Sequence, residues 1–408
     1  LVNADFETKN LGWTVEKASG GNVAYGGTNT NKCFEAWNNS KFDIYQEVAD
    51  APIGVYEISV QGFYRYGRGA TAYEAYQNGT APNDAVNIYV NNNNAHFKSV
   101  FDEPVANGEL YTNADPTKAA DAYVDPNNEY WYPNDMRTGS EAFANGMYVA
   151  TSFGVVAKAG DVLRIGVKGS TNQLNDSWAI WDNFRMVFQG TKAEVVSPLL
   201  SQEILQLQET LDEGKNVGKS VITNANDVLA AANSALSGSD GKAMFDALCS
   251  IIDAKAAYES SAVLFATLQE KNADLYASWM ISVATETVKS EASALYDEIK
   301  SGLENGTLEN EDAEAYLAKI EKMIVQLGIP ADAANASDKN PVELTSLIKT
   351  PSFEKDGANS IEGWNADGYN FGNDDTQKSA LLVEFFDKAF DLNQTIVGLP
   401  NGTYKVGV

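Results

Sequence analysis

The stretch FDIYQEVADAPIGVYEISV at residues 42–60 decides the fold, because the chain repeats it without a gap as FDLNQTIVGLPNGTYKVGV at residues 390–408. In each copy, apolar and polar residues alternate on both sides of a turn that carries Pro and Gly, which is typical of two strands joined as a hairpin. The identical positions are Phe42, Asp43, Gln46, Pro52, Gly54, Tyr56 and Val60, which recur as Phe390, Asp391, Gln394, Pro400, Gly402, Tyr404 and Val408. Two copies of this unit predict two related β-domains with other structure between them.

The first β-domain is expected over residues 1–190. Short alternating runs suit half-buried strands at residues 56–64, 86–90, 148–156, 162–167 and 178–188. Asn-Gly and Ala-Gly pairs mark turns between these runs. Many short strands without a helical period favour an antiparallel β-sandwich or barrel.

The composition changes after Gly190, and residues 191–340 read as helices. Ala, Leu, Glu, Lys and Ser dominate, and Leu200, Ile204, Leu207 and Leu211 recur at helical spacing. Short loops between such stripes predict an antiparallel bundle of about four or five helices. We expect the bundle to act as a rigid spacer, although it could instead line a cleft beside the first sandwich.

The last segment, residues 341–408, repeats the N-terminal opening. Phe353-Glu354 corresponds to Phe6-Glu7, and Trp364 corresponds to Trp13. The sequence therefore predicts a second β-sandwich of the same type. Because residue 408 falls inside the second strand of the repeated unit, we expect a truncated sandwich and a chain that is a fragment of a longer protein.

Charge and composition exclude several functions. The formal net charge is −27, so phosphate backbones and anionic membrane surfaces are unfavourable partners. No apolar run approaches the roughly 20 residues that span a bilayer. Cys33 and Cys249 fall in different expected domains, and His96 is the single histidine, so a disulfide framework, a zinc site and a Ser/His/Asp triad are disfavoured.

Three stretches carry a resemblance to a known group of domains. NADFETKNLGW at residues 3–13 resembles the opening, and WAIWDNFRMVFQG at residues 178–190 the closing strand, of galactose-binding-like jelly-roll modules, which include several carbohydrate-binding module families. YPNDMRTGSEAFANGMY at residues 132–148 is similar to a segment of modular surface proteins of gut Bacteroidetes. The resemblance implies a jelly-roll sandwich, a polysaccharide or other glycan as partner, and an extracellular or outer cell-surface location, with a lipid anchor on a removed N-terminus as one option.

The same resemblance implies a metal site. Several of these modules bind a structural calcium ion where the first and last strands meet, and the matching positions are Glu7 and Asp182. Calcium takes about six to eight oxygen ligands, many of which a sequence does not reveal. In the alternative reading, the two carboxylates bond backbone amides and tie the chain ends together.

Sugar recognition needs aromatic rings against C–H faces and polar groups for the hydroxyls. The segment 121–139 has this composition and no evident strand or helix pattern, and a second candidate follows strand 56–64, with one more ring just before residue 42. The expected ligand-binding residues are Tyr130, Trp131, Tyr132, Arg137, Tyr64, Arg65, Arg68 and Trp37. For each ring alone, packing in the core is the competing interpretation.

The favoured function is non-catalytic carbohydrate binding or adhesion, with no catalytic residue assigned. One alternative is a glycoside hydrolase that uses two of the loop carboxylates Asp121, Asp125, Glu129 and Asp135. The other alternative is a structural stalk without a ligand.

Overall fold

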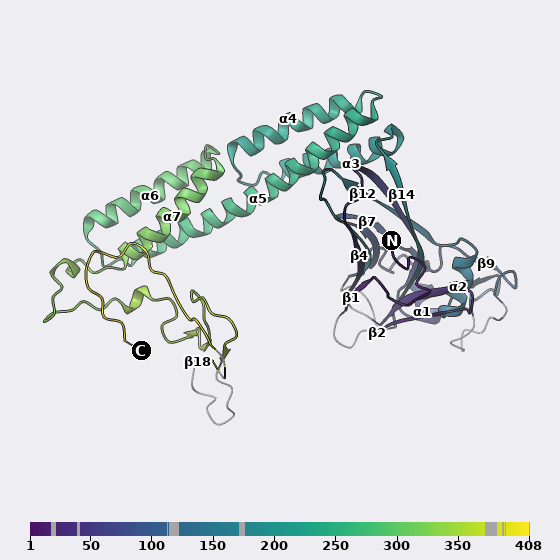
Figure 1. Ribbon diagram of the computed structural model, residues 1–408, viewed down its shortest axis with the longest axis horizontal. Helices are drawn as coiled ribbons and strands as arrows, with labels where there is room; N and C mark the ends of the chain where they lie inside the picture. Colours follow the sequence, from purple (N-terminus) through teal and green to yellow (C-terminus); the bar gives the residue numbers. More distant parts are fainter. Residues whose placement is uncertain are drawn as a thin grey trace. The chain divides into compact units, whose positions relative to one another are not determined.

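The computed structural model of the chain contains two compact units, Leu1–Ser201 with Ala235–Cys249 and Gln202–Ser234 with Ser250–Val408, and each is described by itself (Figure 1). The structure describes residues 1–17, 22–38, 41–111, 113, 122–170, 176–371, 382–385, 387 and 389–407.

The first unit is an antiparallel β-sandwich, as the sequence predicts. Sheet A has the order β1 (Thr14–Lys17), β4 (Phe42–Val48), β13 (Leu163–Gly169), β6 (Val86–Val90) and β7 (Asn93–His96). Sheet B has the order β12 (Val149–Val156), β5 (Gly54–Arg65), β14 (Trp178–Gly190), β3 (Lys32–Trp37) and β2 (Asn22–Gly27). A short strand, β8 (Lys98–Ser99), runs parallel to β5.

The core of the sandwich lies between the two sheets. Sheet A contributes Phe42, Ile44, Ile88, Ile165 and Val167, and sheet B contributes Phe34, Tyr56, Ile58, Val60 and Trp181. These positions alternate along their strands, so period-two patterning places them on the inner faces.

The two halves of the repeated unit do not pair with each other. β4 pairs with β1 and β13, whereas β5 pairs with β12 and β14. The turn between them therefore carries the chain from one sheet to the other, and the hairpin expected from the sequence is wrong. The alternation of a strand specifies which of its residues face the core, but it does not specify which sheet the strand joins. β4 and β5 place their apolar residues in the same core from opposite sheets.

The outer face of sheet B is covered by a third layer. This layer consists of α1 (Gly69–Gln77), α2 (Met136–Ala144) and a small sheet of β9 (Val105–Ala106), β10 (Tyr123–Val124) and β11 (Tyr130–Tyr132). Figure 1 shows α1, α2 and β9 together on one side of the sandwich. A second apolar cluster, with Phe63, Phe101, Phe143 and Trp178, fills the space between the layer and sheet B. The part of sheet B under this layer is thus buried on both faces.

A set of contacts that we call the N-terminal lock joins the start of the chain to β4. The side chain of Gln46 accepts a hydrogen bond from Val2 N at 2.7 Å and donates to Val2 O and Gly12 O at 3.0 Å each. Phe6, in the left-handed region at φ 50°, places its ring centroid 5.1 Å from that of Trp13. These contacts hold the first residues against the sandwich.

Among the described residues, the second copy repeats the lock except for the hydrogen bond to Gly12 O. Gln394 accepts from Lys349 N at 2.8 Å and donates to Lys349 O at 3.2 Å. Phe353 has φ 56°, and its ring centroid lies 5.2 Å from that of Trp364. The repeat is therefore structural as well as sequential.

The strands around the second lock are short. They are β15 (Glu354–Lys355), β16 (Ala358–Asn359), β17 (Asn370–Phe371) and β18 (Val383–Glu384). The described residues of 390–407 form no strand, and Asn393 makes one isolated bridge to Asn365. In the first unit β4 and β5 are each paired on both sides, and the described residues of 341–407 offer no such partners.

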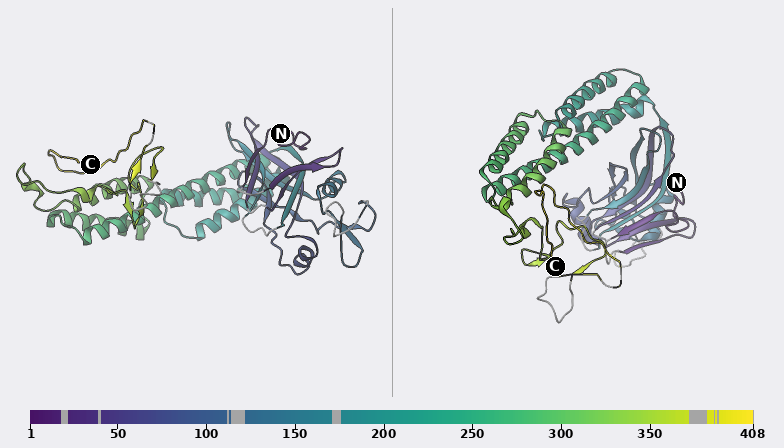
Figure 2. Two further views of the ribbon diagram at one scale, coloured as in Figure 1. Left: turned by 90° about the horizontal axis from the view of Figure 1, so that it is seen from below. Right: turned by 60° about the vertical axis from the view of Figure 1, so that its left-hand side comes forward.

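The middle of the chain is helical, as expected. Five long helices follow the sandwich: α3 (Ala193–Asp212), α4 (Lys219–Leu236), α5 (Gly241–Met280), α6 (Glu286–Asn305) and α7 (Asn310–Leu327). In the second unit, α6 and α7 lie beside the C-terminal part of α5 (Figure 2), and Phe265, Leu295 and Ile320 share their core. None of the described helices has the length and apolar character needed to cross a membrane.

Candidate functional site

The segment 121–139 is a hairpin followed by a helix start, with Asp121 outside the described residues. Asp125 accepts the backbone N–H groups of Asn127 at 3.1 Å, Glu129 at 2.7 Å and Tyr130 at 2.6 Å. Burial alone would raise the pKa of Asp125, but these backbone donors lower it below its ordinary value. The expectation of a patternless loop is therefore wrong.

Asp135 also has a structural position. It caps α2 by accepting Thr138 N at 2.9 Å, and the Thr138 hydroxyl accepts Asp135 N in return. Two of the four candidate carboxylates are thus bonded to backbone, while Glu129 is exposed.

The aromatic residues of this segment divide between core and surface. Tyr132 is 4% exposed, and its ring centroid lies 5.2 Å from that of Phe101 and 6.0 Å from that of Tyr73. Tyr132 thus packs in the core. Tyr130 is 42% exposed, and Trp131 is half-buried with an indole N–H that has no hydrogen-bond partner among the described residues.

Arg137 lies apart from these rings on α2. Its Nη1 is 2.7 Å from Glu141 Oε1, one helical turn onward, so its guanidinium forms an ion pair on the helix surface. The segment 121–139 therefore does not bring its four expected ligand residues to one surface.

The second group of expected residues, at the end of β5, is mostly buried. Tyr64 is 5% exposed, donates its hydroxyl to Ser177 Oγ at 3.2 Å, and has its pKa raised to about 12 by burial. Arg65 is also 5% exposed, whereas Arg68 is exposed at the residue before α1. Both faces of sheet B are covered, so neighbouring residues of β5 are buried on either side.

One row of side chains crosses three adjacent strands at this end of sheet B. Trp178 of β14 is paired with Trp37 of β3 on one side and with Arg65 of β5 on the other. Paired residues of antiparallel strands project from the same face. We call Trp37, Trp178 and Arg65, together with Glu35, Asn134 and Ser177, the sheet-end cluster.

The polar members fix the orientation of the row. The Trp178 indole donates to Glu35 Oε2 at 2.7 Å, and the Arg65 guanidinium carbon lies 5.0 Å from the centroid of the same ring. Arg65 Nη1 donates to Asn134 Oδ1 at 2.9 Å, and Asn134 N is held in turn by the Thr138 hydroxyl. The first turn of α2 thus supports the cluster.

Electrostatics in the cluster follow from burial. Burial raises the pKa of Glu35 above its ordinary value, against the hydrogen bond from Trp178. Burial lowers the pKa of Arg65 to about 10, and the charge of Arg68 lowers it further, while Asp176 and Glu35 oppose the shift. Trp37, half-buried, is the ring of the row that remains partly open.

Sequence reasoning found only part of this cluster. It named Trp37 and Arg65 as ligand residues, but it did not name Trp178, which is 2% exposed, or Glu35, Asn134 and Ser177. The run WAIW, apolar on both faces, is the available signal that β14 lies between two covering layers. Phe386, which replaces Trp37 in the second copy, lies outside the described residues.

The expected metal ligands Glu7 and Asp182 lie near each other. Glu7 Oε1 accepts Lys32 N at 2.6 Å, and Asp182 Oδ1 accepts Asn183 N at 2.7 Å, so both bond backbone amides. Asp182 is fully buried, and burial raises its pKa to about 8, with the charges of Glu7 and Asp5 adding to the rise.

These residues fit a hard cation in charge and in donor type. A buried carboxylate close to two other acids is stabilised by a cation, and Ca²⁺ accepts carboxylate and carbonyl oxygens. Among the described residues, no group of at least three His, Cys, Asp or Glu side chains could hold a metal ion. Backbone oxygens would have to complete such a site.

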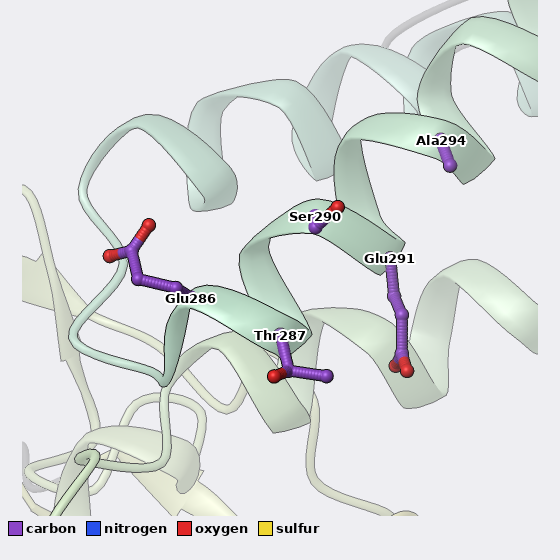
Figure 3. A pocket seen from close by; sticks show the side chains of 5 residues that line it. All are labelled: Glu286, Thr287, Ser290, Glu291 and Ala294. Atoms are coloured by element: carbon purple, nitrogen blue, oxygen red, sulfur yellow. The ribbon is translucent and has the colours of Figure 1, made fainter.

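A shallow hollow in the second unit is lined by none of the expected site residues. Figure 3 shows its lining residues, Glu286, Thr287, Ser290, Glu291 and Ala294, along the first turns of α6. One face of one helix does not enclose a ligand, so we assign no site to it.

No protein-family model and no curated protein matches the chain. Among solved structures, it is similar to the carbohydrate-binding module TmCBM61 in complex with β-1,4-galactotriose, at 14% identity and TM-score 0.24, over 46% of this chain and 97% of that one. It is also similar to the enzymatically active domain of bacteriophage CBA120 tailspike protein 4, at 10% identity and TM-score 0.24, over 46% of this chain and 21% of that one.

A third similar structure holds CBM51-2, in complex with GlcNAc, and INT domains of Clostridium perfringens ZmpB. The identity is 12% and the TM-score 0.17, over 60% of this chain and 43% of that one. At TM-scores this low the three likenesses support no conclusion, and the description of the sandwich rests on its strand pairing.

Proposed function

We propose that the first unit binds carbohydrate without catalysis, at the sheet-end cluster. The observation that carries the proposal is the row Trp37–Trp178–Arg65 across three paired strands. A half-buried indole beside an oriented guanidinium supplies a ring face for a sugar and donors for its hydroxyls.

The rigidity of the cluster supports a binding role. Hydrogen bonds and ring contacts already fix Trp178, Arg65 and Asn134, so little side-chain entropy is lost when a ligand binds. An extracellular or cell-surface location, and a spacer role for the helices, stay predictions.

The test is a glycan array and affinity electrophoresis on the whole chain with two matched variants. Trp37→Ala removes the half-open ring of the sheet-end cluster, and Tyr130→Ala removes an exposed ring of the 121–139 hairpin. We expect Trp37→Ala to lose binding by about tenfold or more and Tyr130→Ala to keep it.

The opposite pattern would assign binding to the hairpin. Unchanged glycan binding by both variants would exclude both surfaces as the binding site. An absence of binding by the natural chain across the panel would favour the stalk.

We also propose that Glu7 and Asp182 hold a calcium ion with a structural role. What supports this is the buried, mutually repelling set of carboxylates around Asp182. The ion would offset that repulsion and tie the opening residues to β14.

A further inference from the structure

The Arg65 guanidinium is buried and forms no ion pair with any described residue. Its guanidinium donates from Nε to Gly67 O at 3.0 Å and from Nη1 to Asn134 Oδ1 at 2.9 Å, and both acceptors are neutral. Among the described residues, no hydrogen bond is made by Nη2, and no ion pair includes Arg65. A buried cation is costly unless it is paired, so this arrangement is completed by an anion from outside.

None of the charged described residues around Arg65 is hydrogen-bonded to its guanidinium. Glu35 uses its Oε2 for the Trp178 indole at 2.7 Å, and it does not reach Arg65 as an ion pair. Arg68, exposed before α1, adds a second guanidinium whose charge acts on Arg65, while Asp176 is the other acid that acts on it. Two carboxylates thus act on Arg65 from a distance, and neither is hydrogen-bonded to it among the described residues, which leaves Nη2 for a ligand with a negative group.

The geometry selects the kind of anion. Arg65 lies against the Trp178 ring, so its planar N–H fork is held in one orientation. Such a fork matches the two oxygens of a carboxylate. Trp37 lies two strands away in the same row, with Trp178 between it and Arg65, and its ring would lie under a neighbouring sugar of the chain.

We infer that the sheet-end cluster recognises an acidic glycan, one whose sugars carry carboxylates as uronic acids do, with Arg65 as the carboxylate contact. This inference rests on the proposed function and names the ligand class of the same site.

The test compares each acidic polysaccharide with its own neutral form. Polygalacturonate, alginate and glucuronoxylan are offered to the whole chain before and after chemical reduction of their carboxyl groups, at fixed ionic strength. We expect at least one acidic form to bind and its reduced form to bind about tenfold more weakly or worse. Equal or tighter binding of the reduced form would overturn the acidic ligand and leave carbohydrate binding intact.

Binding of neither form, together with no binding across a neutral glycan panel, would overturn both proposals. The comparison uses the natural chain, so it does not depend on a variant that folds.

A second arm tests Arg65 itself with an isosteric change. Asn134→Asp places a carboxylate on Arg65 Nη1 and so supplies from within the anion that the ligand would bring. We expect acidic-glycan affinity to fall about tenfold or more while the melting temperature is kept or raised.

Asn94→Asp, an equal charge change at an exposed position of β7, is the control and should leave affinity nearly unchanged. If the two substitutions lowered acidic-glycan affinity equally, Arg65 would not be the residue that contacts the carboxylate.

Discussion

The Arg65 guanidinium carbon lies 5.0 Å from the centroid of the Trp178 ring, and the two residues are register partners on β5 and β14. The indole N–H of that ring is held at Glu35, 2.7 Å away. The ring is thus fixed at its face by a cation and at its edge by a carboxylate.

The edge contact predicts unequal effects of two substitutions at Glu35. Glu35→Ala leaves a buried indole N–H without an acceptor and should cost about 1–3 kcal/mol of unfolding free energy. Glu35→Gln keeps an acceptor oxygen and should cost clearly less. Denaturant melts of both variants check this, and equal losses would contradict the role given to the hydrogen bond.

Asp182 predicts a dependence of stability on pH. Its pKa is about 8 in the folded chain and near 4 when unfolded, so the folded state holds the extra proton between these values. The contribution of Asp182 to the free energy of unfolding is greatest below about pH 4. It falls by up to about 1.4 kcal/mol per pH unit as the pH rises to about 8.

The measurement is the melting temperature of the first unit between pH 5 and 8, with chelator and with calcium. In chelator the midpoint should fall with pH, and calcium should raise it most at pH 8, where Asp182 is ionised. Glu7→Gln is the control and should reduce the calcium effect. A calcium effect absent at every pH would count against the ion.

Gly166 lies where a side chain would collide with its neighbours on sheet A. A Cβ there would stand 2.5 Å from Ile44 O and 2.8 Å from the Tyr45 Cβ. Gly166→Ala should therefore destabilise the first unit by about 1–3 kcal/mol. Gly402→Ala, where a Cβ meets nothing within 4 Å, is the control for calorimetry, and equal melting of the two variants would refute the clash.

Asp125 organises the β10–β11 hairpin through three backbone donors. Asp125→Ala should cost about 2–3 kcal/mol, because three backbone N–H groups of the hairpin lose their acceptor together. Glu129→Ala, at an exposed position, should change stability by about 0.5 kcal/mol or less. If the chain hydrolysed a glycan and both variants lost this activity while staying folded, Asp125 and Glu129 would be catalytic groups instead.

The strands of the sandwich were predictable because each is a local pattern. The expected run 86–90 is the whole of β6, and 178–188 covers all but the last residues of β14. Sheet membership was not predictable, since β4 and β5 alternate in the same way and yet lie in different sheets. Pairing depends on β13 and β14, which follow more than a hundred residues later.

The candidate site was predictable only as composition. The aromatic residues of 121–139 suit a sugar site, but Tyr132 is buried because a third layer packs on sheet B. The same layer buries Arg65, and its side-chain acceptor, Asn134, is distant in sequence. Residues that come together only in the folded structure have no characteristic spacing in the sequence, so the sequence does not reveal that they are partners.

The two copies of the N-terminal lock predict a matched pair of variants. Gln46 is 8% exposed and makes three backbone hydrogen bonds, so Gln46→Ala should cost about 1–3 kcal/mol. Gln394 makes two such bonds at a half-buried position, and Gln394→Ala should cost less. Calorimetric melts check the order, and a larger loss at Gln394 would contradict it.

The lock has a consequence for how the chain is made. The glutamine and its partner are separated by 44 residues in the first copy and 45 in the second, and the hydrogen bonds of the glutamine use no residue from further along the chain. These bonds can therefore form before β13 and β14 of the first copy are synthesised. Phe184 of β14 then packs on the Phe6 and Trp13 rings, so a strand that is made later covers the first lock.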